Sequence, residues 1–132
     1  MSTVLVSLRR PGACRVRHQE SGATLDTEGP TEFGGAGGAF SATDLLAAAL
    51  GTCIATSIDS VAVRHGIPLE ALTVRVEKEL AEGPRRIRSL RVTVTVAAPV
   101  PEDLRQRLRR AAEACPVHRS LHPDLDLRLA IE

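Results

Sequence analysis

Apolar and polar residues alternate at both ends of the chain, and this pattern predicts β-strands. Residues 4–8 alternate ahead of a Pro-Gly turn, and a second extended stretch follows at residues 14–18. That arrangement is typical of a β-hairpin. Residues 23–26 are expected to add a third strand, and residues 125–131 alternate in the same way and predict the last strand of the chain.

The middle of the first half carries apolar residues at intervals of three and four, which predicts one long helix. Ser41 is expected to cap it, with Asp44 three residues later as in a capping box. Gly66 and Pro68 mark its end. At about 1.5 Å per residue the helix is roughly 35 Å long, and Cys53 lies near its middle.

The second half predicts a hairpin and another helix. Residues 73–80 and 86–97 alternate on either side of a Glu-Gly-Pro turn. The apolar residues on the two sides of Arg88 are out of phase, so we expect a bulge near that position. An amphipathic helix is expected to start at Pro101 and to run to Cys115.

The element order βββ-α-ββ-α-β predicts an α+β fold with antiparallel sheets, formed by a single domain over residues 1–132. The length is sufficient for one hydrophobic core. The sequence has no Trp or Tyr and only two Phe, so Leu, Val, Ile and Ala must fill that core.

The charge balance favours no particular class of charged partner. The formal net charge is +1, which favours neither nucleic acid nor an acidic partner. Arginines cluster at residues 85–88 and 105–110, and we interpret both clusters as solvated faces. The N-terminus does not resemble a signal peptide. Asp59 and Arg64 interrupt the longest apolar run short of the roughly 20 residues of a membrane span, so we expect no membrane partner and a cytoplasmic protein.

Two of the three cysteines carry the candidate chemistry. Cys53 and Cys115 are each expected on the buried face of a helix, and without signs of secretion such a pair favours redox chemistry over a structural disulfide. The alternative is two buried small apolar side chains. Burial would raise the pKa of Cys53, so a cation from elsewhere must favour its thiolate. Cys115 would lie at the negative end of its helix, so Cys53 is expected to attack and Cys115 to resolve.

Three motifs together resemble the OsmC/Ohr family: Gly-Gly-Ala-Gly-Gly ahead of the long helix, Ser-Ala-Thr-Asp-Leu-Leu-Ala-Ala-Ala-Leu-Gly-Thr-Cys up to Cys53, and Cys-Pro-Val-His from Cys115. The resemblance implies an intertwined homodimer, in which sheets enclose two long central helices and each reactive site lies at the subunit interface. It also implies reduction of organic hydroperoxides or hydrogen peroxide through two cysteines matching Cys53 and Cys115, in oxidative-stress defence. Dithiols such as dihydrolipoyl proteins would recycle the enzyme, and no cofactor is implied.

Two departures limit the transfer of the family pattern to this chain. Peroxidase members carry a Glu ten residues before the first cysteine, where this sequence has Thr43. Asp44 either substitutes for that carboxylate or serves only as a helix cap. The family's arginine comes from the N-terminal hairpin, where alternation places Arg15 and Arg17 on one strand face, and we favour Arg17. These changes resemble the OsmC-like branch of the family.

Other interpretations stay open at this point. A redox-sensing or small-molecule-binding dimer would hold a hydrophobic ligand in an interface cleft without efficient peroxidase turnover. Cys115, His118 and His122 have a spacing compatible with a metal site, but Pro116 would break the helix that aligns the ligands, and we expect no metal. Cys14 is interpreted as a strand residue.

Overall fold

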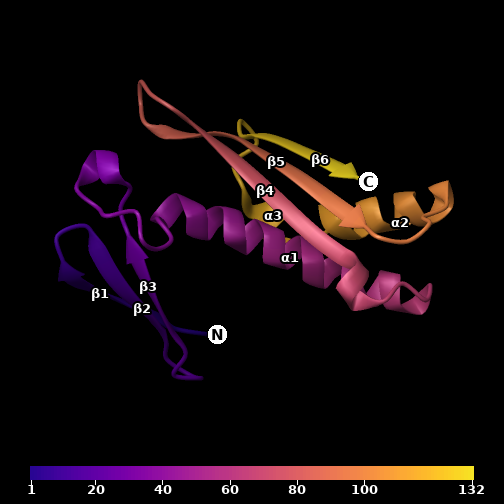
Figure 1. Cartoon of the computed structure of the whole chain (residues 1–132), viewed down its shortest axis with the longest axis horizontal. Coiled ribbons are helices and arrows are strands. Elements are labelled where there is room, and N and C mark those ends of the chain that lie inside the picture. Colours follow the sequence, from indigo (N-terminus) through magenta and orange to yellow (C-terminus); the bar gives the residue numbers. More distant parts are fainter. The chain divides into compact units, whose positions relative to one another are not determined.

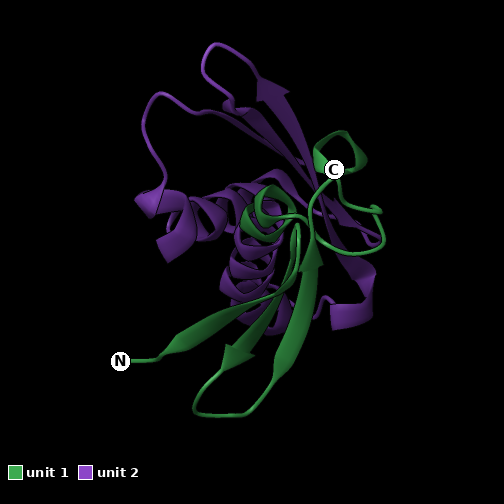
Figure 2. Ribbon diagram, turned by 90° about the vertical axis from the view of Figure 1, so that its left-hand side faces the viewer, with its two compact units in different colours: residues 1–46 green, residues 47–132 purple.

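The computed structural model describes the whole chain, residues 1–132, and its residues form two compact units. Figure 2 colours them separately: residues 1–46 in green and residues 47–132 in purple. Each unit is described by itself below. The assignment of one domain over residues 1–132 stays a prediction.

The first unit is built on a three-stranded antiparallel sheet in the order β1-β2-β3 (Figure 1). Its strands are β1 (Val4–Arg10), β2 (Ala13–His18) and β3 (Thr24–Glu28), and a 3₁₀ turn, η1 (Thr31–Phe33), follows them. The three predicted strands are therefore confirmed.

The register of this sheet separates an apolar face from a polar face. Val6 pairs with Val16, which pairs with Leu25, whereas Ser7 pairs with Arg15 on the opposite face. Because side chains alternate along a strand, the neighbours of Val6 at i±2 share its apolar face. The exposed apolar residues on this face of the sheet are Val4, Val6, Leu8 and Leu25.

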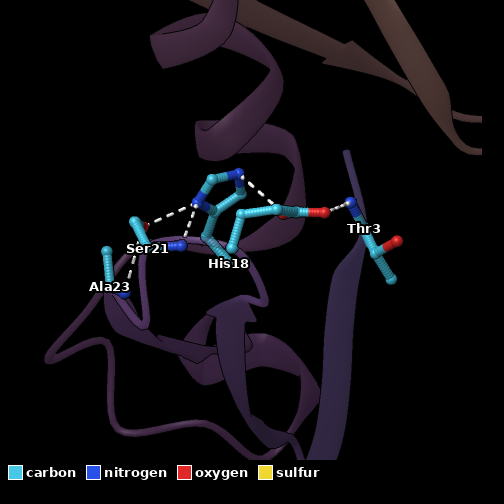
Figure 3. A network of polar contacts seen from close by, with 5 residues as sticks. Thr3, His18, Ser21 and Ala23 are labelled. Atoms are coloured by element: carbon cyan, nitrogen blue, oxygen red, sulfur yellow. Dashed lines mark hydrogen bonds and ion pairs between the residues drawn. The ribbon is translucent and has the colours of Figure 1, made fainter. Parts of the chain in front are cut away.

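A small polar network holds the turn between β2 and β3 (Figure 3). The imidazole Nδ1 of His18 lies 2.6 Å from the Ser21 hydroxyl and accepts the Ser21 N–H at 3.3 Å. The same hydroxyl accepts the Ala23 N–H at 3.2 Å. On its other side, His18 Nε2 lies 3.1 Å from the Glu20 carboxylate, which also accepts the Thr3 N–H at 2.9 Å. The network joins the start of β1 to this turn.

A buried carboxylate organises the glycine-rich segment that precedes the long helix. Glu28, at the end of β3, is only 7% exposed, and its Oε1 accepts from Arg10 at 2.5 Å. Its Oε2 accepts the Gly38 N–H at 3.0 Å, and the Ala36 N–H also bonds the carboxylate. The Arg10 hydrogen bond and the two N–H groups together hold the pKa of Glu28 below its ordinary value.

The long helix predicted from the sequence is α1 (Ala42–Arg64). Ser41 and Asp44 form the expected capping box: the Asp44 N–H donates to the Ser41 hydroxyl at 3.2 Å, and the Ser41 N–H donates to Asp44 Oδ2 at 3.0 Å. One stripe along the helix is buried. It comprises Ala47, Leu50, Ile54, Ile58 and Ala62.

The second unit contains a sheet in the order β4-β5-β6, formed by β4 (Leu72–Ala81), β5 (Arg86–Val96) and β6 (Asp126–Ile131). A short 3₁₀ turn, η2 (Leu69–Ala71), precedes β4. Glu79 pairs with Ser89 and Leu80 with Ile87, so Arg88 is the extra residue of a bulge, as predicted.

The last strand departs from the expected pairing. β4 and β5 are antiparallel, but β6 pairs with β5 in parallel. A parallel partner requires a crossover connection. Two helices supply it, α2 (Glu102–Glu113) and α3 (Pro116–Ser120). The α+β class is confirmed, and the expectation of purely antiparallel sheets is wrong for this pair.

The core of the second unit lies between α1, α2 and the inner face of the sheet. Figure 1 shows α1 running along β4 and β5. The fully buried side chains are aliphatic apart from one cysteine, as the composition predicted: Leu50, Ile54, Ile58, Leu90, Leu108, Val92, Val94 and Cys115. The two aromatic residues, Phe33 and Phe40, are exposed in the first unit instead.

Gly51 lets α1 approach β4 closely. A Cβ atom at this position would lie 3.0 Å from Cγ2 of Val76 and 3.9 Å from Cγ1 of Val74. The first distance is shorter than an ordinary van der Waals contact between carbon atoms. The helix therefore packs against the sheet two residues before Cys53 with almost no space between them.

The expectation that no apolar segment is long enough for a membrane does not hold for α1. By length and composition alone, α1 would suffice to cross a bilayer, in spite of Asp59 and Arg64. Core helices of soluble proteins pass the same test, and the buried stripe of α1 contacts the sheet of the second unit.

Two arginines of the 105–110 cluster are more than a solvated face. Arg105 donates to the carbonyl of Ile131, and Arg109 donates to the carbonyl of Leu129 at 2.9 Å. Both acceptors lie on β6. These half-buried guanidinium groups therefore connect α2 to the final strand.

The Glu28 carboxylate predicts a pH-dependent contact. Because its folded pKa is lowered, its stabilising contribution is present above the ordinary pKa of Glu and is lost as the pH falls through the lowered value. We expect the amide proton shifts of Ala36 and Gly38 to titrate together, with a midpoint below that of an ordinary Glu, in two-dimensional NMR spectra.

Glu28→Gln should abolish this titration and broaden or shift the Gly38 amide signal at neutral pH. Glu32→Gln is the matched control, since Glu32 lies in the adjacent exposed turn η1 and should leave the titration unchanged. The role of Glu28 would be contradicted if the Ala36 and Gly38 amide shifts titrated with an ordinary Glu pKa in both Glu28→Gln and Glu32→Gln.

Candidate redox site

The structure places the two predicted cysteines in different local settings. Cys53 lies on α1 beside the buried stripe and is partly exposed. Cys115 is fully buried, and it is not the last residue of α2, which ends at Glu113. It is the N-cap of α3, where its sulfur accepts the His118 N–H at 3.2 Å. Cys115 therefore follows the carboxyl end of α2, as predicted, and its N–H bonds the Ala112 carbonyl at 3.2 Å, but it also caps the amino end of α3, which the sequence did not predict.

Pro116 explains this difference. The sequence pattern ends the predicted helix at Cys115, just before Pro116, but Pro116 occupies the first position of the next helix. Proline is well suited to that position, because its fixed φ is helical and the N–H it lacks would have no partner inside the helix. The chain therefore turns at Cys115, which directs the sulfur into the core.

The two cysteines are brought together as free thiols. The Cys115 side chain hydrogen-bonds Cys53, and neither residue is in a disulfide. The sulfur of Cys53 also accepts from the Val117 N–H and from the Ser57 hydroxyl. Three donors thus surround one sulfur, and all of them belong to the second unit.

These contacts set the acidity of Cys53. Burial alone raises its pKa, but the hydrogen bonds from Cys115, Val117 and Ser57 outweigh burial and bring the pKa below the ordinary value of a cysteine. The causes that lower the pKa of Cys53 are hydrogen bonds within the second unit, and none of them is a cation. Cys53 is therefore the thiol that ionises first.

Cys115 shifts in the opposite direction. Its burial raises its pKa, and the hydrogen bond to Cys53 and the charge of that sulfur raise it further, against smaller effects of the His118 and Val117 N–H groups. When the pair loses one proton, the partly exposed Cys53 therefore becomes the thiolate, and the buried Cys115 thiol donates to it.

Sequence reasoning missed the donors around Cys53. Ser57 lies four residues after Cys53, hence on the same helix face, and this spacing alone was a usable signal. The Val117 N–H belongs to the first turn of α3. A Cys-Pro pair can begin a helix as well as follow one, and that alternative would have revealed this donor.

The other predicted residues lie in the first unit. Arg15 forms an ion pair with Asp26 at 2.9 Å, whereas Arg17 on the same face forms no ion pair. Asp44 uses Oδ2 in the helix cap, and the Thr43 hydroxyl lies 3.2 Å from that of Ser41. The roles proposed for Arg17 and Asp44 in chemistry stay predictions.

The third cysteine and the histidines near Cys115 have other surroundings. Cys14 lies in β2, as predicted, between Leu8 and Thr27 of the neighbouring strands. His118 bonds Cys115 through its backbone N–H rather than its ring. The Nδ1 of His122 accepts the Asp124 N–H at 3.1 Å. No group of three His, Cys, Asp or Glu residues is arranged to hold a metal ion.

Comparison with known proteins settles the family. The family model for OsmC-like proteins matches residues 35–130, which include both cysteines of the site. The chain belongs to the OsmC/Ohr family. A search of curated proteins finds no match by sequence.

Solved structures of this family share the fold of the chain. A protein from Psychrobacter arcticus 273-4, described as an osmotic stress induced and detoxification response protein, is 30% identical with a TM-score of 0.93. The match covers 100% of this chain and 96% of the Psychrobacter chain. An organic hydroperoxide resistance protein OsmC from Legionella pneumophila has 22% identity and a TM-score of 0.80, with coverage of 100% and 96%. An organic hydroperoxide resistance protein from Elizabethkingia anophelis has 16% identity and a TM-score of 0.75, again with coverage of 100% and 96%.

The hydrogen bond from Cys115 predicts the reactivity of Cys53. In a Cys14→Ser background, Cys115→Ala removes one of three donors, so the pKa of Cys53 should rise. Alkylation of Cys53 by iodoacetamide at pH 7 should then slow by roughly threefold to tenfold. The pH dependence of the alkylation rate measures this shift.

Cys14→Ser alone is the control and should alkylate at the wild-type rate, since Cys14 takes no part in these hydrogen bonds. Ser57→Ala should slow alkylation in the same direction as Cys115→Ala. An unchanged profile in Cys115→Ala would show that the Cys115 thiol does not stabilise the Cys53 thiolate.

Proposed function

We propose that this protein is a two-cysteine peroxidase that reduces organic hydroperoxides or hydrogen peroxide in cytoplasmic oxidative-stress defence. The observation that carries the proposal is the pairing of a partly exposed Cys53, whose pKa is lowered, with a fully buried Cys115 that donates to it. A peroxidase needs a thiolate that peroxide can reach and a second thiol within reach of the product.

The relatives support the same class of reaction. The Legionella pneumophila and Elizabethkingia anophelis structures are named for organic hydroperoxide resistance, and the Psychrobacter arcticus protein for detoxification. The family match covers both cysteine contexts of this chain. Three free thiols are in keeping with a reducing compartment.

In the first step the Cys53 thiolate attacks the terminal oxygen of the hydroperoxide. A sulfur–oxygen bond forms, the O–O bond breaks, and the departing alkoxide takes up a proton to leave as an alcohol. Cys53 becomes a sulfenic acid. Its sulfur is then no longer charged, which removes one of the causes that hold Cys115 protonated.

In the second step Cys115 loses its proton and attacks the sulfenic sulfur. A disulfide forms between the two cysteines, the S–O bond breaks, and the hydroxyl group leaves as water after protonation. A dithiol such as a dihydrolipoyl protein then reduces the disulfide, so that its two thiols become a disulfide and both cysteines regain their protons.

A second candidate function follows from position 43. The family's peroxidase carboxylate is replaced by Thr43, whose hydroxyl contacts Ser41. This favours a redox-sensing or small-molecule-binding dimer in which Cys53 is oxidised without efficient turnover. Thr43→Glu distinguishes the two functions, because it should accelerate a peroxidase and leave the oxidation of a sensor unchanged.

Single cysteine variants test the peroxidase directly. Cys53→Ser should reduce the consumption of cumene hydroperoxide to the background rate, because no nucleophile remains. Cys115→Ser should react once and stop, leaving a sulfenic acid on Cys53 that dimedone traps. Cys14→Ser should turn over like the wild type. Stopped-flow kinetics and peptide mapping, which should find a Cys53–Cys115 disulfide in the oxidised wild type, measure these outcomes.

The supporting arginine is tested in the same assay. Arg17→Ala should slow the first attack, whereas Arg15→Ala, which removes the arginine already paired with Asp26, should change it less. Equal slow rates for wild type and Cys53→Ser with every hydroperoxide would refute the peroxidase and leave the binding function.

We further propose that the chain acts as a homodimer. The apolar face of the β1-β2-β3 sheet is exposed, with Val6 at 63% and Leu8 at 73%. Monomeric proteins rarely expose contiguous apolar patches of this kind. A second copy supplies a self-complementary cover, and an obligate interface would bury more than roughly 2,000 Å².

Opposite faces of one strand provide a matched pair of variants. Val6→Glu places a charge on the apolar face and should shift the protein from dimer to monomer, whereas Ser7→Glu lies on the other face beside Arg15 and should not. Sedimentation velocity at micromolar concentration measures the change. A monomeric wild type at that concentration would contradict the dimer.

A further inference from the structure

A basic cavity lies between the end of α1 and the second half of α2, within the second unit. It has a volume of about 480 Å³ and is lined by Val61 and Arg64 from α1, by His65 directly after α1, and by Arg107, Arg110 and Ala111 from α2. Cavities that bind small molecules have about 300–1,000 Å³. Val61 lies eight residues beyond Cys53, which is roughly 12 Å along a helix, so this cavity is separate from the thiol pair.

The lining follows from the helical repeat. In each of the two segments, α1 with its following turn and α2, the three lining residues are spaced i, i+3 and i+4, so they share one face. The two faces present small apolar side chains, Val61 and Ala111, between long cationic ones. Three guanidinium groups and one imidazole are thereby gathered around a single hollow.

These arginines lack the partners that their neighbours have. Arg105 and Arg109 bond β6 carbonyls and form ion pairs with Glu102 and Glu113. In contrast, the three cavity arginines form no ion pair or side-chain hydrogen bond. They are Arg64, Arg107 and Arg110.

Stabilisation of helix ends does not account for the cluster. Arg64 and Arg110 lie in last turns, where a cation favours the helix. Arg107 lies in the middle of α2 and gains nothing in this way. Like charges placed together repel one another, and an anion between them removes that repulsion.

The ring of His65 is already oriented. Its Nδ1 lies 2.9 Å from the Val61 carbonyl, so this nitrogen is the donor and carries the hydrogen. The ring is therefore held on the backbone of α1 through Nδ1, and its second nitrogen, Nε2, has no partner in the structure.

We propose that this cavity binds a soluble phosphorylated small molecule with at least two negative charges. Guanidinium groups match phosphate oxygens through paired N–H donors, and three of them suit a multiply charged anion better than a single carboxylate. Val61 and Ala111 would contact the uncharged part of the molecule. Binding here is independent of the peroxidase reaction.

Isothermal titration calorimetry with pyrophosphate tests the proposal on the full chain at low and physiological salt. We expect saturable binding that weakens as salt increases, since exposed charges are screened. Arg107→Gln and Arg64→Gln, which change one helix each, should each weaken binding at least about tenfold. Arg86→Gln, an equal loss of charge in the β4–β5 hairpin, should bind like the wild type.

Further measurements make the outcomes decisive. Thermal unfolding shows whether each variant is folded, and the two helices provide independent variants. Cys53→Ser should bind pyrophosphate unchanged, which separates this site from the proposed peroxidase. Absence of pyrophosphate binding to the wild type would overturn the proposal, even if vesicles containing phosphatidic acid bind. Equal weakening by Arg86→Gln would also overturn it, because binding would then reflect net charge alone.

Discussion

The buried thiol of Cys115 is the constraint on which the candidate site depends. It caps α3 by accepting the His118 N–H, and it donates to Cys53. One side chain therefore determines where a helix begins and how acidic the neighbouring thiol is. Because Cys115 has no exposed surface, it is shielded from oxidants that reach Cys53. The division of roles between the two sulfurs thus follows from their burial.

The aliphatic core explains how α1 holds its reactive residue in place. Leucine, isoleucine, valine and alanine side chains are small enough for the helix to lie directly on the sheet, and Gly51 removes the last obstacle opposite Val76. Protein interiors of this density transmit small displacements. The backbone at Cys53, two residues further along, is fixed relative to β4, while its sulfur keeps partial access to solvent.

The features that sequence predicted correctly are those decided by nearby residues. The capping box at Ser41 depends on four consecutive positions, and the bulge at Arg88 depends on alternation within one strand. The errors concern tertiary pairing. The parallel partner of β6 is set by a crossover of two helices, and no pattern within the strand specifies that direction. The role of Cys115 was missed because Pro116 is compatible with both the end and the start of a helix.

The arginines that reach from α2 to β6 have a further consequence for solubility. β6 is an outer strand, and Leu129 and Ile131 have carbonyl groups that do not bond β5. Such a row of unpaired carbonyls is a template on which another chain can add a strand. Arg105 and Arg109 fill two successive acceptors of that row and place charge beside them. Helix α2 thereby blocks the open edge of the sheet. It does so with two arginines that the net charge alone would identify only as surface residues.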